Sequence, residues 1–182
     1  MADDELIDYY DDDGHRLGVA ARRAVHRAGD WHRTLHLWLA SQEERGSLLY
    51  QLRANGAANW PGLLDASVAG HLLAGETDAE AMREAREEIG IVVPPDRTVL
   101  LGVRREVDPA TEGGWNRELQ AVHLARLDPA WGRFAAIDRE AAGLAWVNND
   151  EGMRLHRGEA ATIVARMTLF DGQRAIEERR SL

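Results

Sequence analysis

The chain contains no cysteine, and this absence sets its first limits. Without thiols it forms no disulfide, thiolate metal site or cysteine nucleophile, and the redox compartment stays undetermined. It also has no apolar run near the roughly 20 residues that a membrane-spanning helix needs. The N-terminal segment MADDELIDYY is acidic, whereas a secretion signal is basic and then apolar. We therefore expect a cytoplasmic protein that does not enter membranes.

Positive charge is also scarce. Lysine and arginine total 22 against 31 acidic residues, which gives a formal net charge of −9. This balance argues against binding to nucleic acid or anionic membranes. It leaves phosphorylated small molecules open as substrates, because a bound cation can reverse the local field. With 182 residues and 45% hydrophobic content, we expect one domain with a sizeable core, as a monomer or homodimer.

Hydrophobic periodicity and turn residues predict strands and helices in alternation, without a long linker or repeat. The expected strands are Leu6–Tyr10, Arg16–Ala20, Thr34–Ala40, Ser47–Arg53, Leu64–His71, Thr98–Val107, Glu118–Leu127 and Leu144–Val147. The expected helices are Arg22–Ala28, Asp78–Ile89, Asp150–His156 and Ala160–Glu178, the last with a break at Asp171-Gly172. This order fits an α/β/α sandwich around a mixed sheet. We expect it to form one domain over residues 1–182, with residues 1–5 flexible and residues 160–182 helical.

The segment from Glu76 to Glu88, ETDAEAMREAREE, is the most informative part of the sequence. Thr77 and Glu80 form a capping-box pair, and Gly90 is typical of a helix end. At 3.6 residues per turn, one arc is apolar and is expected to pack inward. This arc holds Ala81, Met82, Ala85 and Ile89. Another arc holds the carboxylates of Glu80, Glu84, Glu87 and Glu88.

Such crowding of carboxylates is unfavourable in an isolated helix. Like charges four residues apart, such as Glu80 and Glu84, cost roughly a few tenths of a kcal/mol. Mg²⁺ prefers oxygen ligands and is often shared between carboxylates and substrate phosphates. The ordinary alternative is a solvated acidic face that binds nothing. The glycines that flank the helix, Gly70, Gly75 and Gly90, favour the metal site.

The order of the flanking residues resembles a known family motif. Gly70, five residues, Glu76 and then REAREEIGI from Arg83 resemble the Nudix box, GX5EX7REUXEEXGU, where U is aliphatic. Two positions depart from it: six residues instead of seven separate Glu76 from Arg83, and Ala85 is small for the aliphatic position. The resemblance implies a Nudix hydrolase. Such an enzyme uses Mg²⁺, or Mn²⁺ in its place, to hydrolyse a diphosphate linkage.

The resemblance also implies roles for individual residues. Glu87 and Glu88 would bind Mg²⁺ directly, and Glu84 would share the ion or orient the attacking water. Arg83 would hold a glutamate of the cluster by an ion pair, while Gly70 and Glu76 would shape the loop at the substrate. The general base stays open, because members of the family use different carboxylates for that step.

Other segments are similar to the branch of the family that contains isopentenyl-diphosphate isomerases. They are Trp31–Leu39, Trp60-Pro61-Gly62 and Asp65–His71. In those isomerases a cysteine directly before the Gly-His pair moves a proton. Here that position is Ala69, which cannot, so a hydrolase of the same branch is favoured. An isomerase-like enzyme without the cysteine and a noncatalytic ligand-binding module remain alternatives; the intact Arg83–Glu88 block argues against the second.

The same branch implies a second metal site built from histidines and carboxylates. The matching residues are His26, His36, His71 and Glu118. Asn116 stands where the second carboxylate is expected, and His32 is an alternative to His36. Neutral imidazole with carboxylate suits Zn²⁺ or Mn²⁺. The alternative interpretation is that these histidines are structural residues with hydrogen-bonded rings.

Arginines and tryptophans supply the candidates for substrate contacts. Guanidinium binds phosphate through two parallel hydrogen bonds, which makes Arg53, Arg104 and Arg105 candidate phosphate clamps. The tryptophans Trp60, Trp115 and Trp131 lie in or beside predicted loops, where a ring can stack on a base or cover an isoprenoid-like chain. The alternatives are surface arginines and tryptophans that close the edge of the core.

Overall fold

The computed structural model describes residues 5–44, 46–56, 60–109, 114–135, 141–159, 162, 164–171 and 174–181. The expected flexibility of residues 1–4 lies outside this range. The strands are β1 (Leu6–Tyr10), β2 (Arg16–Ala21), β3 (Trp31–Ala40), β4 (Ser47–Arg53), β5 (Leu64–Asp65), β6 (Val68–His71), β7 (Thr98–Pro109), β8 (Trp115–Arg126), β9 (Ala141–Asn148), β10 (Val164–Asp171) and β11 (Arg174–Ser181). The helices are α1 (Arg22–Ala28), α2 (Asp78–Ala81), α3 (Arg83–Ile89) and α4 (Asn149–His156), with 3₁₀ turns at Pro95–Arg97 and Pro129–Trp131. No helix in the described ranges is long and apolar enough to cross a membrane.

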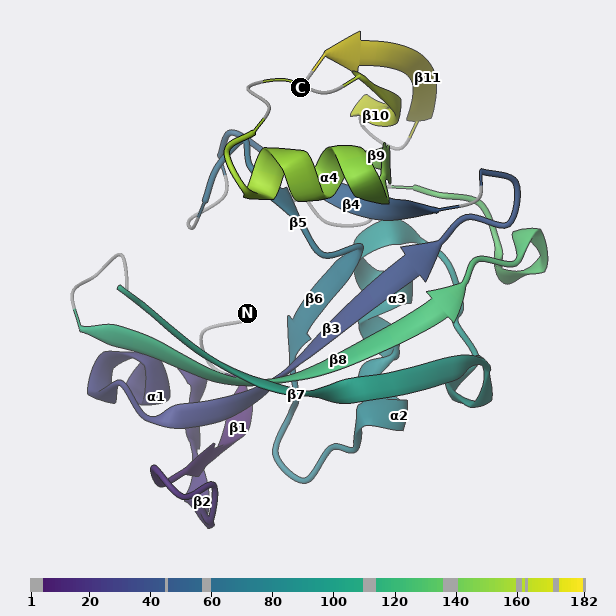
Figure 1. Cartoon of the computed structure of the whole chain (residues 1–182). Coiled ribbons are helices and arrows are strands. Elements are labelled where there is room, and N and C mark those ends of the chain that lie inside the picture. The colour runs from purple at the N-terminus through teal and green to yellow at the C-terminus, as the bar shows by residue number, and fades with distance from the viewer. Residues whose placement is uncertain are drawn as a thin grey trace.

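Strand β3 is the centre of one mixed sheet (Figure 1). Along one edge it pairs in parallel with β8, from Trp31 to Ala40. Along the other edge it pairs antiparallel with β1, β6 and β4 in succession. Strand β7 extends the sheet beyond β8, and β9, β10 and β11 extend it beyond β4. This arrangement brings α1, β3, β6 and α3 together, and the candidate site is built from them.

The alternation of side chains along β4 shows how helices cover both faces of the sheet. Leu49 is fully buried in the same core cluster as Ile89 of α3, and Gln51 hydrogen-bonds Glu88 of α3. Tyr50 lies between them in sequence and points to the other face. There α4 comes so close that a Cβ built on Gly152 would lie 3.1 Å from the Tyr50 hydroxyl. The expected α/β/α sandwich is therefore confirmed.

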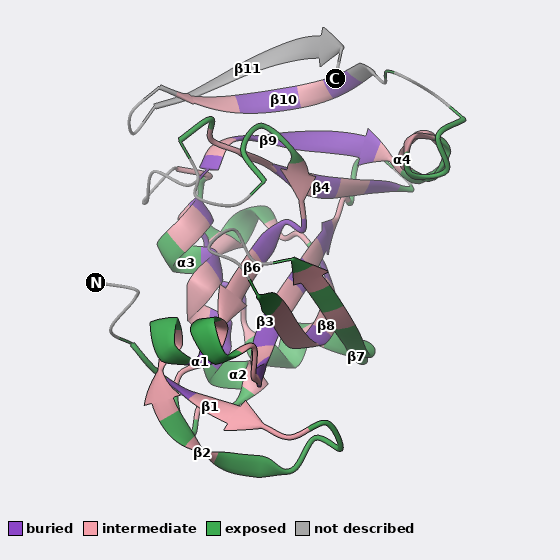
Figure 2. Cartoon of the chain, turned by 90° about the vertical axis from the view of Figure 1, so that its left-hand side faces the viewer, coloured by how far each residue is buried: buried purple, intermediate pink, exposed green. Residues whose placement is uncertain are grey.

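The apolar arc predicted for the Glu-rich helix forms part of the core. Its four members, Ala81, Met82, Ala85 and Ile89, are all buried. They pack in one cluster with the leucines of β3 at positions 35, 37 and 39. Figure 2 shows this contrast along the chain, with buried residues in β3 and β9 and exposed residues in α1 and β7. Burial of this arc leaves the carboxylates on a different side of the helix.

The helix is divided, where the sequence predicted a continuous one. It begins with a capping box between Thr77 and Glu80, as expected, and ends at Gly90 in the left-handed conformation. Between α2 and α3, however, Met82 interrupts the regular pattern. There the Ala85 amide donates to the Met82 carbonyl three residues back rather than four. The expectation of one helix over Asp78–Ile89 is therefore wrong at its middle.

Two strand predictions also need correction. The successive strands predicted at Thr34–Ala40 and Ser47–Arg53 would suit a hairpin, but they pair only at its closed end, because β4 pairs with β9 along most of its length. The expected strand Leu64–His71 is split into β5 and β6. Between them Ser67 turns inward, where its hydroxyl donates to the Leu49 carbonyl and accepts from the Leu39 amide.

The predicted C-terminal helix over Ala160–Glu178 is wrong. This region forms β10 and β11, an antiparallel pair whose first strand also pairs with β9. Residues such as Ala165, Arg166 and Met167 have good helix propensity, which favoured the wrong prediction. Ala165 and Met167 are buried with Arg166 half-exposed between them, the period-two pattern of a strand. Tertiary pairing with β9 overrides the local preference.

Candidate active site and metal centres

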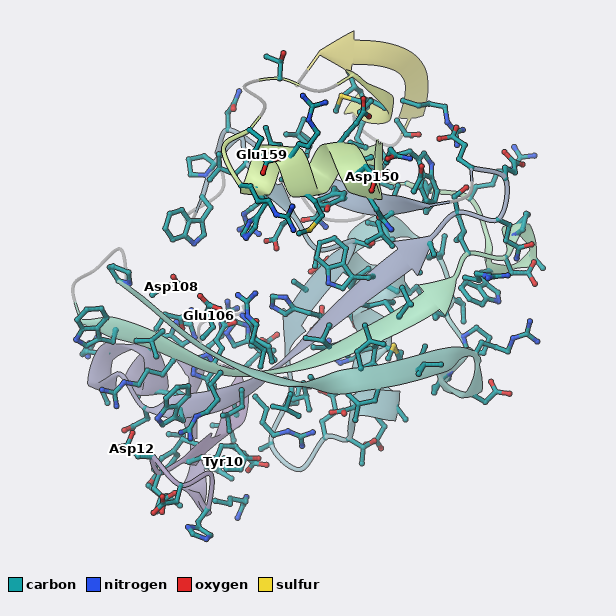
Figure 3. All side chains as sticks on the ribbon, viewed as in Figure 1. Tyr10, Asp12, Glu106, Asp108, Asp150 and Glu159 are labelled. Atoms are coloured by element: carbon teal, nitrogen blue, oxygen red, sulfur yellow. The ribbon has the colours of Figure 1, made fainter. Side chains whose placement is uncertain are left out.

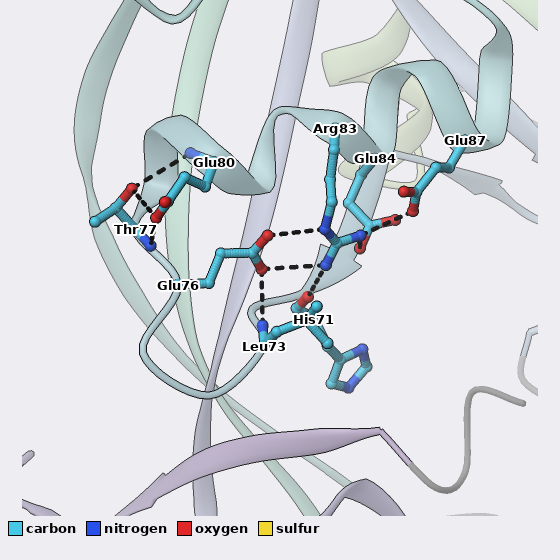
Figure 4. A network of polar contacts seen from close by, with 8 residues as sticks. All are labelled: His71, Leu73, Glu76, Thr77, Glu80, Arg83, Glu84 and Glu87. Atoms are coloured by element: carbon cyan, nitrogen blue, oxygen red, sulfur yellow. Dashed lines mark hydrogen bonds and ion pairs between the residues drawn. The ribbon is translucent and has the colours of Figure 1, made fainter.

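Arg83, the first residue of α3, lies at the centre of a polar network (Figure 4). Its guanidinium donates to both carboxylate oxygens of Glu76, at 2.8 and 3.1 Å, and to the His71 carbonyl at 3.3 Å. The same group donates to Glu84 at 2.7 Å and to Glu87 at 2.8 Å. Glu76 thus reaches Arg83 although the interval between them is one residue shorter than in the Nudix box. The ion pairing predicted for Arg83 is present.

Glu76 also fixes the loop before the helix. Its Oε2 accepts from the Leu73 amide at 2.7 Å, and its side chain is only 9% exposed. One carboxylate therefore ties the loop to the start of α3. This geometry matches the supporting role expected of Glu76.

Glu84 packs directly against strand β6. A Cβ built on Gly70 would lie 2.3 Å from the Glu84 carboxyl carbon, so a larger residue there would displace the Glu84 side chain. The Glu84 side chain is 14% exposed, and burial raises its pKa to about 7. Arg83 opposes this rise, and the neighbouring charges of Glu87 and Glu76 add to it. A bound cation would favour the ionised carboxylate.

Glu88 lies one helical turn after Glu84 in α3 and contacts Ala69, the residue before Gly70 in β6. Its Oε2 accepts from the Ala69 amide at 3.4 Å and from Nε2 of Gln51 at 3.0 Å. Glu87, in contrast, is 55% exposed at the rim. Glu84, Glu87 and Glu88 each supply carboxylate oxygens, the donors that Mg²⁺ and Mn²⁺ prefer. The residues present fit such an ion.

Gln51 was not among the residues predicted for the site. Its contact with Glu88 joins two elements that are far apart in sequence, so no local motif contains it. One signal was available. Ser47, Leu49 and Gln51 alternate along β4 on the inward face, and a polar residue at such a position requires a partner.

A second cluster consists of three histidines from different elements. His26 of α1, His32 of β3 and His71 of β6 each offer a ring nitrogen, and these nitrogens all lie within 4.8 Å of one another. Nε2 of His26 lies 3.0 Å from Nε2 of His71, and the rings of His32 and His71 stack with 5.1 Å between centroids. Within the part of the chain that the structure describes, buried Nε2 of His32 has no hydrogen-bond partner.

Burial favours the neutral form of the His32 and His71 rings. It lowers the pKa of His32, and it lowers the pKa of His71 well below 6.5, with the nearby Arg22 and the other histidines adding to the effect. Neutral imidazole is the form that binds metal ions, and three such nitrogens suit Zn²⁺ or Mn²⁺. The orphaned nitrogen of His32 and the close approach of His26 to His71 fit a shared ion.

His36 lies outside this cluster. Its Nε2 is 3.8 Å from Oε2 of Glu118, and the sheet register places it opposite Ala69. His32, which the sequence offered as an alternative, takes the place in the cluster that His36 was expected to fill. The sequence left both histidines open, and the structure places His32 in the cluster.

Glu118 is buried among neutral donors. Its carboxylate accepts from Asn116 at 2.8 Å, from Gln120 at 2.9 Å and from Thr34 at 3.3 Å. Burial alone would raise the pKa of Glu118, but the hydrogen bonds from Gln120 and Asn116, together with nearby His32 and His36, hold it below its ordinary value. Asn116 therefore acts as a donor to Glu118. Glu106 of β7 is the register partner of Glu118, and Figure 3 shows Glu106 pointing to the side of the sheet on which α4 lies.

The candidate phosphate clamps have partners within the protein. Arg53 contacts Asp65 at 3.3 Å, and Arg104 pairs with Glu106. Arg105 stacks on the Trp31 ring at 4.4 Å and donates to the Asp12 carbonyl, next to the turn between β1 and β2. The structure therefore does not bring Arg105 to the carboxylate cluster.

The three tryptophans differ in their surroundings. Trp131 is partly buried and packs on the main core cluster, as expected of a residue that closes a core edge. Trp115 is 51% exposed at the start of β8, and Trp60 is 54% exposed with a positive φ of 51°. Trp60 and Trp115 are therefore available for contact with a ligand.

The chain as a whole was compared with known proteins. The NUDIX domain model matches residues 30–167. The chain belongs to the Nudix family. It is 32% identical over 105 residues to an uncharacterized Nudix hydrolase of Clostridium acetobutylicum, covering 57% of this chain and 51% of that protein. The chain thus spans about half the length of that relative.

The branch indicated by the sequence also appears among the relatives. An isopentenyl-diphosphate Delta-isomerase of Corynebacterium efficiens is 31% identical over 150 residues, covering 79% of this chain and 76% of that enzyme. Among solved structures, a protein of Deinococcus radiodurans has a TM-score of 0.60 and 25% identity, covering 86% of this chain and 92% of that one. The predicted membership of a Nudix branch related to these isomerases is confirmed.

Proposed function

We propose that this Nudix protein is a Mg²⁺-dependent hydrolase that cleaves the diphosphate linkage of a small molecule, such as a nucleoside-diphosphate derivative. The observation that supports this proposal best is the convergence of Glu84, Glu87 and Arg83 beside Gly70. Mn²⁺ is an alternative ion. A bound ion would lower the pKa of a coordinated water and shield the charge of the diphosphate.

Each residue of the carboxylate cluster has a task in this proposal. Glu87 and Glu88 would hold the ion, and Glu84 would share it or orient the attacking water. Arg83 keeps Glu84 and Glu87 at a fixed separation, and Glu76 holds the loop that precedes them. Water adds to one phosphorus while the bridging P–O bond breaks, giving two phosphorylated products or a monophosphate and inorganic phosphate. Correct placement of water and phosphorus in line adds to the rate.

The histidine cluster is proposed as a second divalent site, for Zn²⁺ or Mn²⁺, with His26, His32 and His71 as ligands. The support is the three converging nitrogens and the orphaned Nε2 of His32. Figure 4 shows the ring of His71 pointing away from Arg83, so this site lies apart from the carboxylate cluster. Glu118 and His36 are then neighbours of the site.

The test is a panel of diphosphate compounds assayed with Mg²⁺ or Mn²⁺. We expect turnover of at least one compound, and a loss of about 100-fold or more in Glu87→Gln, because one strong electrostatic group leaves the site. Glu80→Gln is the matched control, since Glu80 bonds to Thr77 at the start of α2 instead of joining the cluster. Equal activity of the wild type and Glu87→Gln would rule out the assigned ligands.

A second candidate function is that of an isomerase-like enzyme. It is favoured by the similarity to the Corynebacterium isomerase and opposed by Ala69, which has no proton to transfer. We expect no isomerisation of isopentenyl diphosphate by the wild type. If Ala69→Cys restored that reaction, the chain would be a decayed isomerase. Metal and diphosphate binding without turnover of any compound would instead indicate a noncatalytic binding module.

A further inference from the structure

We infer that Gln51 is a positioning residue for Glu88: its buried amide holds the Glu88 carboxylate in the orientation that a divalent ion requires. This inference rests on the proposed function, because Glu88 is a proposed ligand. It adds a residue of β4 to a site otherwise built from β6 and α3. Gln51 touches no substrate in this scheme and acts only through Glu88.

Gln51 is a polar residue at a buried position of the sheet. Gln51 is 4% exposed and lies on the inward face of β4, two residues from fully buried Leu49. An apolar side chain would fill such a place without cost, whereas an amide there is unfavourable unless it is hydrogen-bonded. Its partner is the carboxylate of Glu88, with 3.0 Å between Nε2 and Oε2. The contact with Glu88 therefore explains why a polar residue occupies this buried position.

Two donors bond to the same oxygen of Glu88. The Ala69 amide also donates to Oε2 of Glu88, at 3.4 Å. Gln51 and Ala69 belong to different strands, so their two bonds define the rotation of the carboxylate about its terminal bond. Gln51 is itself held in the sheet, since its backbone is in register with Asp65 of β5 and Leu144 of β9. A ligand oriented from rigid strands keeps its geometry when the ion is absent.

The groups that orient the glutamates differ in charge. Arg83 orients Glu84 and Glu87 but brings a positive charge, which competes with a bound cation. The Gln51 amide is neutral, so it orients Glu88 without cancelling the charge that attracts the ion. Hydrogen bonds from outer residues to a metal ligand commonly change metal affinity by about 10- to 100-fold when they are removed.

The test replaces Gln51 with methionine, which has a similar length and no donor. We expect Gln51→Met to bind Mg²⁺ about 10-fold more weakly by titration calorimetry in the presence of a non-hydrolysable diphosphate analogue. Mg²⁺ is the chosen ion because the histidine cluster favours other metals. Gln51→Leu should behave in the same way. In activity assays, the loss should shrink as the Mg²⁺ concentration rises.

The matched control is Ser67→Ala. Ser67 is a buried polar residue next to the same strand, and its hydroxyl bonds to the Leu49 carbonyl and the Leu39 amide without touching Glu88. This variant should lower the melting temperature and leave Mg²⁺ affinity unchanged. If Ser67→Ala weakened Mg²⁺ binding as much as Gln51→Met, Gln51 would be only a structural residue.

A double-mutant cycle separates this inference from the proposed function. In a Glu88→Gln background, Gln51→Met should have no further effect on Mg²⁺ affinity, because its contact partner has lost its charge. An undiminished effect there would overturn the positioning role. If Glu88→Gln alone leaves Mg²⁺ affinity unchanged, the proposed ligand set is wrong. If Glu88→Gln weakens binding and Gln51→Met does not, only the role of Gln51 is wrong.

Discussion

The carboxylate cluster and the histidine cluster share strand β6 but differ in how their charges are balanced. His71 joins them, since its carbonyl accepts from Arg83 and its ring stacks on His32. The carboxylate cluster includes its own counter-charge, the Arg83 guanidinium, which contacts Glu76, Glu84 and Glu87. In the histidine cluster, burial favours the neutral form of His32 and His71, and one buried nitrogen, Nε2 of His32, has no hydrogen-bond partner among the described residues.

This difference indicates two kinds of preorganisation. The carboxylates are held in place without an ion, because Arg83 and the backbone of β6 already fix them. A cation that binds there would take over part of the charge compensation that Arg83 gives to the glutamates. Among the described residues, Nε2 of His32 lacks a hydrogen-bond partner, and a bound cation would complete its contacts. We therefore expect the first site to be sensitive to packing changes and the second to depend on metal.

The largest effect is expected from Gly70→Ala. The added methyl would meet the Glu84 carboxyl carbon at 2.3 Å, so Glu84 must move. A displacement of about 1 Å at a reacting centre can cost roughly 100-fold in rate, and we expect a loss of 100- to 1000-fold in kcat. The control is Gly56→Ala, where a Cβ meets nothing within 4 Å and which should retain activity. Wild-type turnover by Gly70→Ala would show that Glu84 is not held where the chemistry needs it.

The next effect compares two histidines. His32→Gln removes a proposed ligand of the second ion, whereas His36→Gln changes a residue outside the cluster. We expect His32→Gln to weaken binding of Zn²⁺ by about 100-fold or more, beyond the usual effect of an outer residue, and His36→Gln to change it only a few-fold. Competition with a chromogenic chelator measures both. The reverse order of effects would restore His36 as the ligand.

These two clusters also show what the sequence could and could not predict. The carboxylate cluster lies within residues 70–88, so helical spacing placed its buried arc correctly, whereas Glu80, predicted on the carboxylate arc, bonds to Thr77 at the start of α2 instead. The histidine cluster draws on α1, β3 and β6. Its membership depends on the register of β3, which determines that His32 and not His36 joins His26 and His71.

Long-range contacts account for the other failures. Gln51 reaches Glu88 only because β4 lies beside β6 and α3 in space. Likewise, β10 is a strand because β9 offers it a partner, although Ala165, Arg166 and Met167 have good helix propensity. Local pattern predicts the elements whose structure is local, and it misses those for which pairing across the sheet overrides it.

Removal of the counter-charge should reveal how far the first cluster depends on it. Arg83→Met leaves Glu76 and Glu84 without their shared partner, and Glu76 is 9% exposed. We expect a loss of about 2 kcal/mol in the free energy of unfolding, because a buried charge is left unpaired. Arg83→Lys should recover only part of this, since an ammonium cannot reproduce the forked contacts. Urea unfolding in chelator measures both variants, and unchanged stability of Arg83→Met would contradict the expected balance.

The smallest expected effect is the dependence of folding stability on pH, to which the histidines and Glu84 contribute with opposite signs. In the folded protein the pKa values of His32 and His71 lie below 6.5, so below that pH the unfolded chain binds more protons and stability falls as pH falls. Glu84 has the opposite sign: its folded pKa is about 7 against an ordinary 4.5, so its contribution is lost as pH rises through that window. In chelator the two slopes partly cancel between pH 5.5 and 6.5.

Glu84→Gln removes one of the two opposing slopes. The variant should therefore lose stability more steeply than the wild type on going from pH 6.5 to 5.5, by up to about 1.4 kcal/mol per pH unit, the limit for one group. Urea midpoints at pH 5.5, 6.0 and 6.5 in chelator give both slopes. Added Zn²⁺ should steepen the dependence in both proteins, because protons compete with the ion for the histidines. Parallel slopes for wild type and Glu84→Gln would mean that the Glu84 carboxyl is already ionised in the folded protein. Burial against Gly70 would then not raise the pKa of Glu84.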